Sequence, residues 1–112
     1  MSGGPEGDAA RRLEEMRQKI RAVDEELIGL VKRRYDLVLA IGRAKAELGM
    51  PVMDPSQEAV VVRRAAELAR EHDVDEELIR DVIWRIIASA RDAQEGRTRW
   101  GPPSDEDLPD EP

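Results

Sequence analysis

The chain has 112 residues, a net charge of −7 and 38% charged residues of both signs, so it is long enough for one domain and too short for two. The acidic balance argues against a nucleic-acid binder or a protein that docks on anionic membranes. The absence of cysteine excludes disulfides, zinc ribbons and thiol nucleophiles.

The two ends of the chain differ in composition from the segment between them. Residues 1–7 are Gly-rich, and we expect a disordered N-terminal tail. Residues 98–112 combine Pro with acidic side chains and are expected to form a solvated tail, in which Trp100 leaves a docking-peptide role open. No apolar stretch is typical of a signal peptide or a membrane span, and together with the lack of cysteine this indicates a cytoplasmic protein. One helical domain is therefore expected over residues 8–97.

An apolar heptad pattern runs through the first half of that domain. One column repeats every seven residues and a second column interleaves with it, which is typical of a long helix packed on a partner helix. No Pro occurs from residue 6 to residue 50, so a helix of roughly 40 residues could extend about 60 Å. Because such a helix needs a partner along most of its length, we expect a homodimer. The two columns are Leu13, Ile20, Leu27, Arg34, Ile41 and Leu48, and Met16, Val23, Leu30, Leu37 and Ala44.

Turn and cap residues divide the rest of the domain into two further helices. Gly49 is expected to end the long helix, and Asp54 is an N-cap for a helix over about 56–71. Asp75 is the expected N-cap of a third helix over about 76–96. No strand pattern, internal repeat or cofactor loop is present, so the expected fold is all-α, with a long, a short and a medium helix. The predicted inward positions are Val61, Ala65, Leu68 and Ala69 on the second helix, and Ile79, Ile83, Ile86, Ala90 and Ala93 on the third.

The face that the long helix should bury carries two cations. Arg34 falls in an apolar column, and Lys45 follows eleven residues later, three helical turns along the same face. Arg34 could extend from the seam to solvent or set its register, and Lys45 could complement the helix dipole. As a pair they indicate an internal anion site, because two unpaired cations in a seam are costly unless a negative group joins them.

Arg17 adds a geometric constraint. It precedes Arg34 by seventeen residues, roughly 25 Å along a straight helix. The two side chains therefore cannot hold one small molecule within a single subunit. In an antiparallel dimer the partner's Arg17 could meet Arg34 and Lys45, although an isolated Arg at this place would be ordinary surface decoration.

The remaining polar candidates have ordinary explanations when taken singly. Gln94 ends the inner stripe of the third helix and could simply reach solvent, and Glu58 opens the second helix, where it complements the dipole. His72 lies in a charged turn and is expected to be solvated. Nothing is typical of a Ser-His-Asp triad, paired acids or a metal cluster, so an enzyme here would work by positioning and electrostatics, with no cofactor and no metal.

Taken as a set, these positions resemble a known family. The runs MRQKIRAVDEELIGLVKRR (16–34) and AIGRAKAELGMPVMD (40–54), followed by Glu58 and Gln94, are similar to the AroQ-type, all-helical chorismate mutases over about 13–94. The resemblance implies an intertwined homodimer of three-helix subunits, in which each site borrows an Arg from the other chain. It also implies the pericyclic rearrangement of chorismate to prephenate in the shikimate pathway, for phenylalanine and tyrosine biosynthesis.

The same resemblance implies a role for each site residue. Arg34 and the partner's Arg17 would grip the two carboxylates of chorismate. Lys45 and Gln94 would bind the ether oxygen, where charge develops as its bond breaks, and Glu58 would bind the ring hydroxyl. The expected catalytic residues are Lys45, Gln94, Arg34 and Glu58, and the substrate-binding set adds Arg17, Asp54, Gln57 and Ala90.

Two positions depart from the family pattern. Gln57 stands where many members carry Arg or Lys, and Ala90 stands where a hydroxyl residue often helps to hold a carboxylate. Both changes remove polar contacts on the carboxylate side, which is consistent with weaker binding, with a compensating partner elsewhere or with a different substrate. Related dianions leave open a 4-amino-4-deoxychorismate mutase or an isochorismate-pyruvate lyase. The lyase is the weaker of these because Glu58 is retained. A non-catalytic helical dimer, or a regulatory partner that kept the scaffold, is the alternative from another class.

Overall fold

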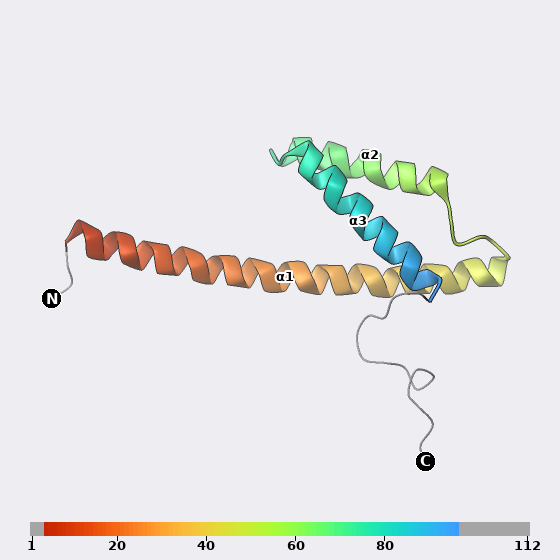
Figure 1. The fold of residues 1–112 in the computed structure, drawn as a ribbon, viewed down its shortest axis with the longest axis horizontal. Helices are drawn as coiled ribbons and strands as arrows, with labels where there is room; N and C mark the ends of the chain where they lie inside the picture. Colours follow the sequence, from red (N-terminus) through yellow and green to blue (C-terminus); the bar gives the residue numbers. More distant parts are fainter. Residues whose placement is uncertain (1–3, 97–112) are drawn as a thin grey trace, which may run out of the picture. The chain divides into compact units, whose positions relative to one another are not determined.

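The computed structural model describes residues 4–96, and in that range it consists of three α-helices without a strand. The predicted all-α class and the order of long, short and medium helix are confirmed. The C-terminal tail predicted at 98–112, with Trp100, lies outside the described residues. The helices are α1 (Pro5–Leu48), α2 (Pro55–Glu71) and α3 (Glu76–Gln94), shown in Figure 1.

The chain divides into two compact units, residues 1–36 and residues 37–112. The first unit contains the N-terminal part of α1. The second contains the last turns of α1 together with α2 and α3. Every contact described below between different elements lies inside the second unit.

α1 begins earlier than the sequence indicated. Residues 5–7, expected in a disordered tail, form its first turn, and the backbone N–H groups of Gly7 and Asp8 donate to the Gly4 carbonyl. Pro5 is favourable there because its ring presets a helical φ and its missing N–H would have no partner in the first turn. The acidic side chains of Glu6 and Asp8 complement the positive end of the helix dipole.

The predicted stop at Gly49 is confirmed in its geometry. Gly49 has φ +68°, a conformation in which a Cβ is strained. The N–H of Met50 donates to the Lys45 carbonyl at 2.8 Å, and the N–H of Gly49 donates to the Ala46 carbonyl at 3.2 Å. These two bonds are the Schellman pattern, which satisfies carbonyls that would otherwise lack partners at a helix end.

The apolar columns of α1 are exposed in the single chain, and α1 contains no buried residue. In the first unit, six column residues leave between 46% and 60% of their surface exposed. Complete burial of a fully exposed apolar side chain contributes about 1.5–3 kcal/mol, so covering the exposed half of each of these six would contribute roughly half as much apiece. The six residues are Leu13, Met16, Ile20, Val23, Leu27 and Leu30.

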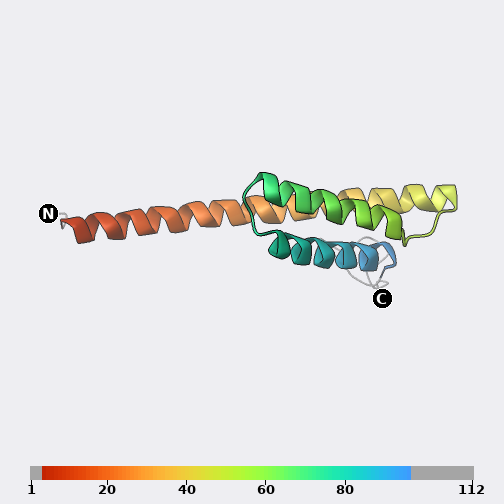
Figure 2. The same cartoon turned by 90° about the horizontal axis from the view of Figure 1, so that it is seen from above.

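α2 and α3 pack against each other as an antiparallel pair, as Figures 1 and 2 show. Four of the five buried residues on these two helices are alanines, and such small side chains allow helices to approach closely. The predicted inward positions Ala65, Ala69 and Ala93 are confirmed as buried. Ile87, at 6% exposed, was not predicted, whereas the predicted Leu68 remains 37% exposed. The buried residues of the described part are Ala65, Ala66, Ala69, Ile87 and Ala93.

Side chains cap both shorter helices as predicted. The Asp54 carboxylate accepts from the Gln57 N–H at 3.2 Å, with Pro55 at the first helical position. The Asp75 carboxylate accepts from the Glu77 N–H at 3.0 Å. Each such cap supplies an acceptor to an N–H that the helix itself cannot satisfy.

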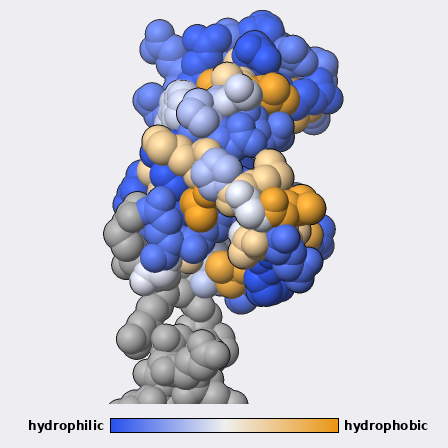
Figure 3. All heavy atoms as spheres, turned by 90° about the vertical axis from the view of Figure 1, so that its right-hand side faces the viewer, coloured by the Kyte–Doolittle hydropathy of each residue, from blue (hydrophilic) through white to orange (hydrophobic). Residues whose placement is uncertain are grey.

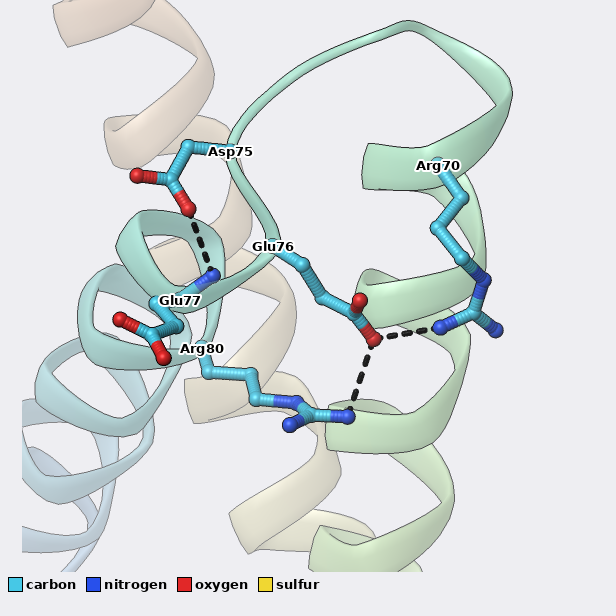
Figure 4. A network of polar contacts seen from close by, with 5 residues as sticks. All are labelled: Arg70, Asp75, Glu76, Glu77 and Arg80. Atoms are coloured by element: carbon cyan, nitrogen blue, oxygen red, sulfur yellow. Dashed lines mark hydrogen bonds and ion pairs between the residues drawn. The ribbon is translucent and has the colours of Figure 1, made fainter.

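An ion-pair network holds the start of α3 against the end of α2 (Figure 4). The Glu76 carboxylate accepts from Arg70 on α2 and, at 3.0 Å, from Arg80 on α3. Asp73 between the helices has φ 55° and permits the tight reversal. Together, the ion pairs of Glu76 and the reversal at Asp73 orient the start of α3 relative to the end of α2.

Apolar side chains also reach the surface of the second unit, where Figure 3 shows them as orange areas among blue. Val60, Leu78, Val82 and Trp84 leave 43–53% of their surface exposed. Within residues 4–96, no helix is long and apolar enough to cross a membrane.

Candidate active site

Lys45 lies in the last turn of α1, where the positive charge complements the helix dipole. Its Nζ donates to the Val52 carbonyl at 2.9 Å, in the loop that leads to α2. The side chain is only partly exposed. An ammonium has three donors, so this bond positions the head group and leaves two donors for another acceptor.

Gln94 is the last residue of α3, and its amide Nε2 donates to the Val38 carbonyl of α1 at 2.9 Å. Gly42 of α1 lies directly beneath it, since a Cβ at that position would come within 3.3 Å of the Gln94 Cγ. The glycine therefore gives the Gln94 side chain room to lie against α1. One amide N–H and the amide oxygen remain for other partners.

Glu58 in the first turn of α2 forms an ion pair that the sequence analysis missed. Arg91 of α3 directs one guanidinium nitrogen, Nη2, at both carboxylate oxygens, at 2.7 Å from Oε1 and 2.6 Å from Oε2. The pair is largely withdrawn from solvent, with the Arg91 side chain 28% and the Glu58 side chain 17% exposed. Charge-assisted bonds of this length are among the stronger polar contacts in proteins.

The environment of Arg91 favours its charged form. Its hydrogen bond to Glu58 raises the pKa of the guanidinium above its ordinary value, while burial acts in the opposite direction. Its Nε is buried and has no hydrogen-bond partner among the described residues. One sequence signal could have identified it, because Arg91 is a cation three residues before Gln94, which places the two side chains on the same face of the helix.

The other predicted residues of the second unit lie around the start of α2 and the end of α3. Asp54 is occupied as the N-cap of α2. Gln57 is exposed and makes no side-chain contact comparable to that of Glu58. Ala90 is partly exposed and directly precedes Arg91. A cation therefore does stand next to Glu58, but Arg91 of α3 supplies it, whereas position 57 of α2 carries a neutral Gln.

Arg17 and Arg34 belong to the first unit and lie on one continuous helix. Seventeen residues separate them, about 25 Å at the rise of an α-helix, so one chain cannot bring the two together. Neither takes part in an ion pair within residues 4–96. Arg17 is exposed and Arg34 partly exposed.

The polar side chains described above suit a reaction that depends on positioned hydrogen bonds and charge. The single His, His72, is exposed at the end of α2 and far along that helix from Glu58. No group of three or more metal-ligating side chains occurs in the described part of the chain. Lys45, Arg91 and Gln94 offer N–H donors, and Glu58 offers the acceptor.

Comparison with known proteins identifies the family. The sequence model of the family "Chorismate mutase type II" matches residues 16–95, which include all the site residues above. The chain belongs to the type II chorismate mutase family. The resemblance inferred from residues 16–34 and 40–54 is therefore confirmed, and with it membership of an enzyme family of the isomerase type.

The relatives carry different names. The chain is 34% identical to a chorismate mutase of Methanocaldococcus jannaschii, over 60% of this chain and 68% of that protein. It is 37% identical to a 4-amino-4-deoxychorismate mutase of Streptomyces venezuelae, over 67% of this chain and 73% of that protein. It is also 33% identical to the bifunctional chorismate mutase/prephenate dehydratase of Escherichia coli, over 64% of this chain but only 19% of that longer protein.

Proposed function

We propose that this protein is a chorismate mutase that converts chorismate to prephenate for phenylalanine and tyrosine biosynthesis. The family match over residues 16–95 carries the proposal. The active domain is assigned to residues 8–97. A cytoplasmic location is part of the proposal, since a chain without cysteine suits a reducing compartment.

The proposed reaction needs no nucleophile and no obligatory proton transfer. An enzyme accelerates such a rearrangement by holding the reactive conformer and by aiming donors at the atom that gains charge. Lys45 and Gln94 take this role at the ether oxygen, with the donors that their bonds to Val52 and Val38 leave free. Those two bonds hold the side chains in place before the substrate arrives.

The two carboxylates of chorismate are assigned to Arg34 and to Arg17 of the partner subunit. For Arg34, a position in an apolar column without an ion pair within residues 4–96 supports this assignment, because a cation in a buried seam needs an anionic partner. The separation of about 25 Å between Arg17 and Arg34 on one helix requires that they serve different sites in a dimer.

The proposed homodimer predicts a concentration-dependent stability. Covering the exposed stripe from Leu13 to Leu30 with a second copy links folding to association, so the midpoint of thermal unfolding should rise with protein concentration. Sedimentation equilibrium at micromolar concentration should give twice the mass of the 12.6 kDa chain. A compact, stable monomer in that experiment would contradict both the dimer and the shared site.

The proposed activity is tested by incubating purified protein with chorismate, isochorismate and 4-amino-4-deoxychorismate in parallel. We expect conversion of chorismate to prephenate, followed as loss of chorismate absorbance and identified by mass and chromatography. Release of pyruvate from isochorismate would indicate the lyase instead. If no compound is consumed by a folded dimer, the non-catalytic or regulatory alternative replaces the proposal.

A second candidate activity is that of a 4-amino-4-deoxychorismate mutase. The similarity to the Streptomyces venezuelae protein of that name, at 37% identity, favours it specifically. The two substrates share the dianionic frame and differ in the ring substituent, a hydroxyl or an amine. The choice between them therefore depends on the surroundings of Glu58.

A further inference from the structure

The negative charge of Glu58 is already balanced within the chain, by the guanidinium of Arg91. Arg91 Nη2 contacts both carboxylate oxygens at 2.6 and 2.7 Å. A carboxylate has about four acceptor positions, so Glu58 can still accept a hydrogen bond from a ligand. The acceptor offered to a ligand is thus one half of a neutral pair and not a free anion.

Charge balance at this place discriminates between the two candidate substrates. A ring hydroxyl is a neutral donor, and it can bond to a carboxylate whether or not a cation stands beside it. A ring amine is largely protonated at neutral pH, as alkyl amines are. Two donors on one carboxylate lie about 3–5 Å apart, so an ammonium bound to Glu58 would be repelled by the Arg91 guanidinium.

We propose that Arg91, paired with Glu58, is a specificity-determining residue that makes the site prefer a substrate with a neutral ring hydroxyl over one with a cationic ring amine. The inference rests on the proposed function, in that it takes Glu58 to face the ring substituent. It assigns Arg91 as a positioning residue, which acts on the substrate through the charge of Glu58.

Direct binding of a substrate carboxylate by Arg91 makes a different prediction. Gln57 leaves the start of α2 without a cation, so Arg91 could leave Glu58 and bind a substrate carboxylate. Both candidate substrates carry the same carboxylates, so such a contact would affect them equally. The ratio of the two specificity constants, and not either constant alone, separates the two roles.

The decisive experiment measures kcat/KM for chorismate and for 4-amino-4-deoxychorismate at neutral pH, with the full-length protein and its Arg91→Gln variant. We expect the wild-type protein to favour chorismate by at least about tenfold. Arg91→Gln should shift the ratio toward the amine by about tenfold, because the ammonium then meets an unbalanced carboxylate. Arg91→Lys keeps the charge and should keep the ratio within about threefold of wild type.

Two further variants make the test independent of any one folding outcome. Arg85→Gln removes the same charge from an exposed place on α3 that has no ion pair within residues 4–96, and it should leave the ratio unchanged. Glu58→Gln leaves Arg91 unbalanced and should shift the ratio further toward chorismate, opposite to Arg91→Gln. An equal loss for both substrates in Arg91→Gln, or no change of ratio in either variant, would overturn the proposal.

Binding separates this proposal from the proposed function. In the Lys45→Ala background, where turnover is slowed, calorimetry gives dissociation constants for both compounds. The same shifts in the ratio of these constants are expected there. If the wild-type protein turns over neither compound, the proposed function fails, while the binding ratios still confirm or contradict the role of Arg91.

Discussion

Replacement of Lys45 by alanine is expected to lower kcat/KM for chorismate by at least about 10²-fold, since losing one donor aimed at developing charge costs roughly 2.7–4 kcal/mol. The loss should fall mainly on kcat, because the ether oxygen gains electron density only as its bond breaks. The structure places the Lys45 ammonium at the Val52 carbonyl with two donors to spare. Steady-state kinetics with chorismate measure the effect.

The control for this variant removes a neighbouring cation that is not directed at the site. Arg43 is exposed, two residues before Lys45 on the same helix, and Arg43→Ala should keep kcat/KM within about threefold of wild type. Because Lys45→Ala also removes the bond to Val52, its unfolding midpoint is measured alongside its kinetics. Activity of Lys45→Ala within threefold of wild type would reduce Lys45 to a cation that complements the helix end.

Mixing an Arg17→Ala protein with an Arg34→Ala protein should restore activity that each lacks alone. The two side chains lie about 25 Å apart on one helix, so a site that needs both must combine two chains. In the mixed dimer one site receives both substitutions and the other receives neither. Statistical exchange makes half of the dimers mixed, so activity should recover to about a quarter of the wild-type level.

Subunit exchange must be verified in the same samples, for example with a mass-shifted tag on one variant. The matched control mixes Arg17→Ala with Arg17→Ala carrying that tag, which can produce no intact site. Verified exchange without recovery would mean that Arg17 does not serve the neighbouring site. The proposed dianion site, shared between Arg34 of one chain and Arg17 of the other, would then fail with it.

Much of the fold could be inferred from the order of residues along the chain. Asp54, Asp75 and Gly49 act on backbone groups only a few positions away, so the helix ends they set were predictable without knowledge of the packing. The start of α1 at Pro5 was not predicted, but its cause is also local. The Gly4 carbonyl accepts the first hydrogen bonds, and the Pro5 ring presets a helical φ.

The faces of the shorter helices were predictable only in part. Apolar periodicity indicates the direction of a helix face within about one position, and several neighbouring residues can satisfy it. Ile87 is buried at 6% exposed, whereas Leu68 remains 37% exposed, although both are apolar residues of the two helices that pack together. Such a choice depends on the partner helix as much as on the helix itself.

The family followed from residues spaced along the chain, and so did the separation of Arg17 from Arg34, because both depend on residue identity and helical rise alone. The polar contacts of the candidate site required the packed structure. Arg91 meets Glu58 across 33 residues, and Gln94 meets Val38 across 56. No local pattern encodes these distances, because the three-dimensional packing of α3 against α2 and α1 determines which side chains meet.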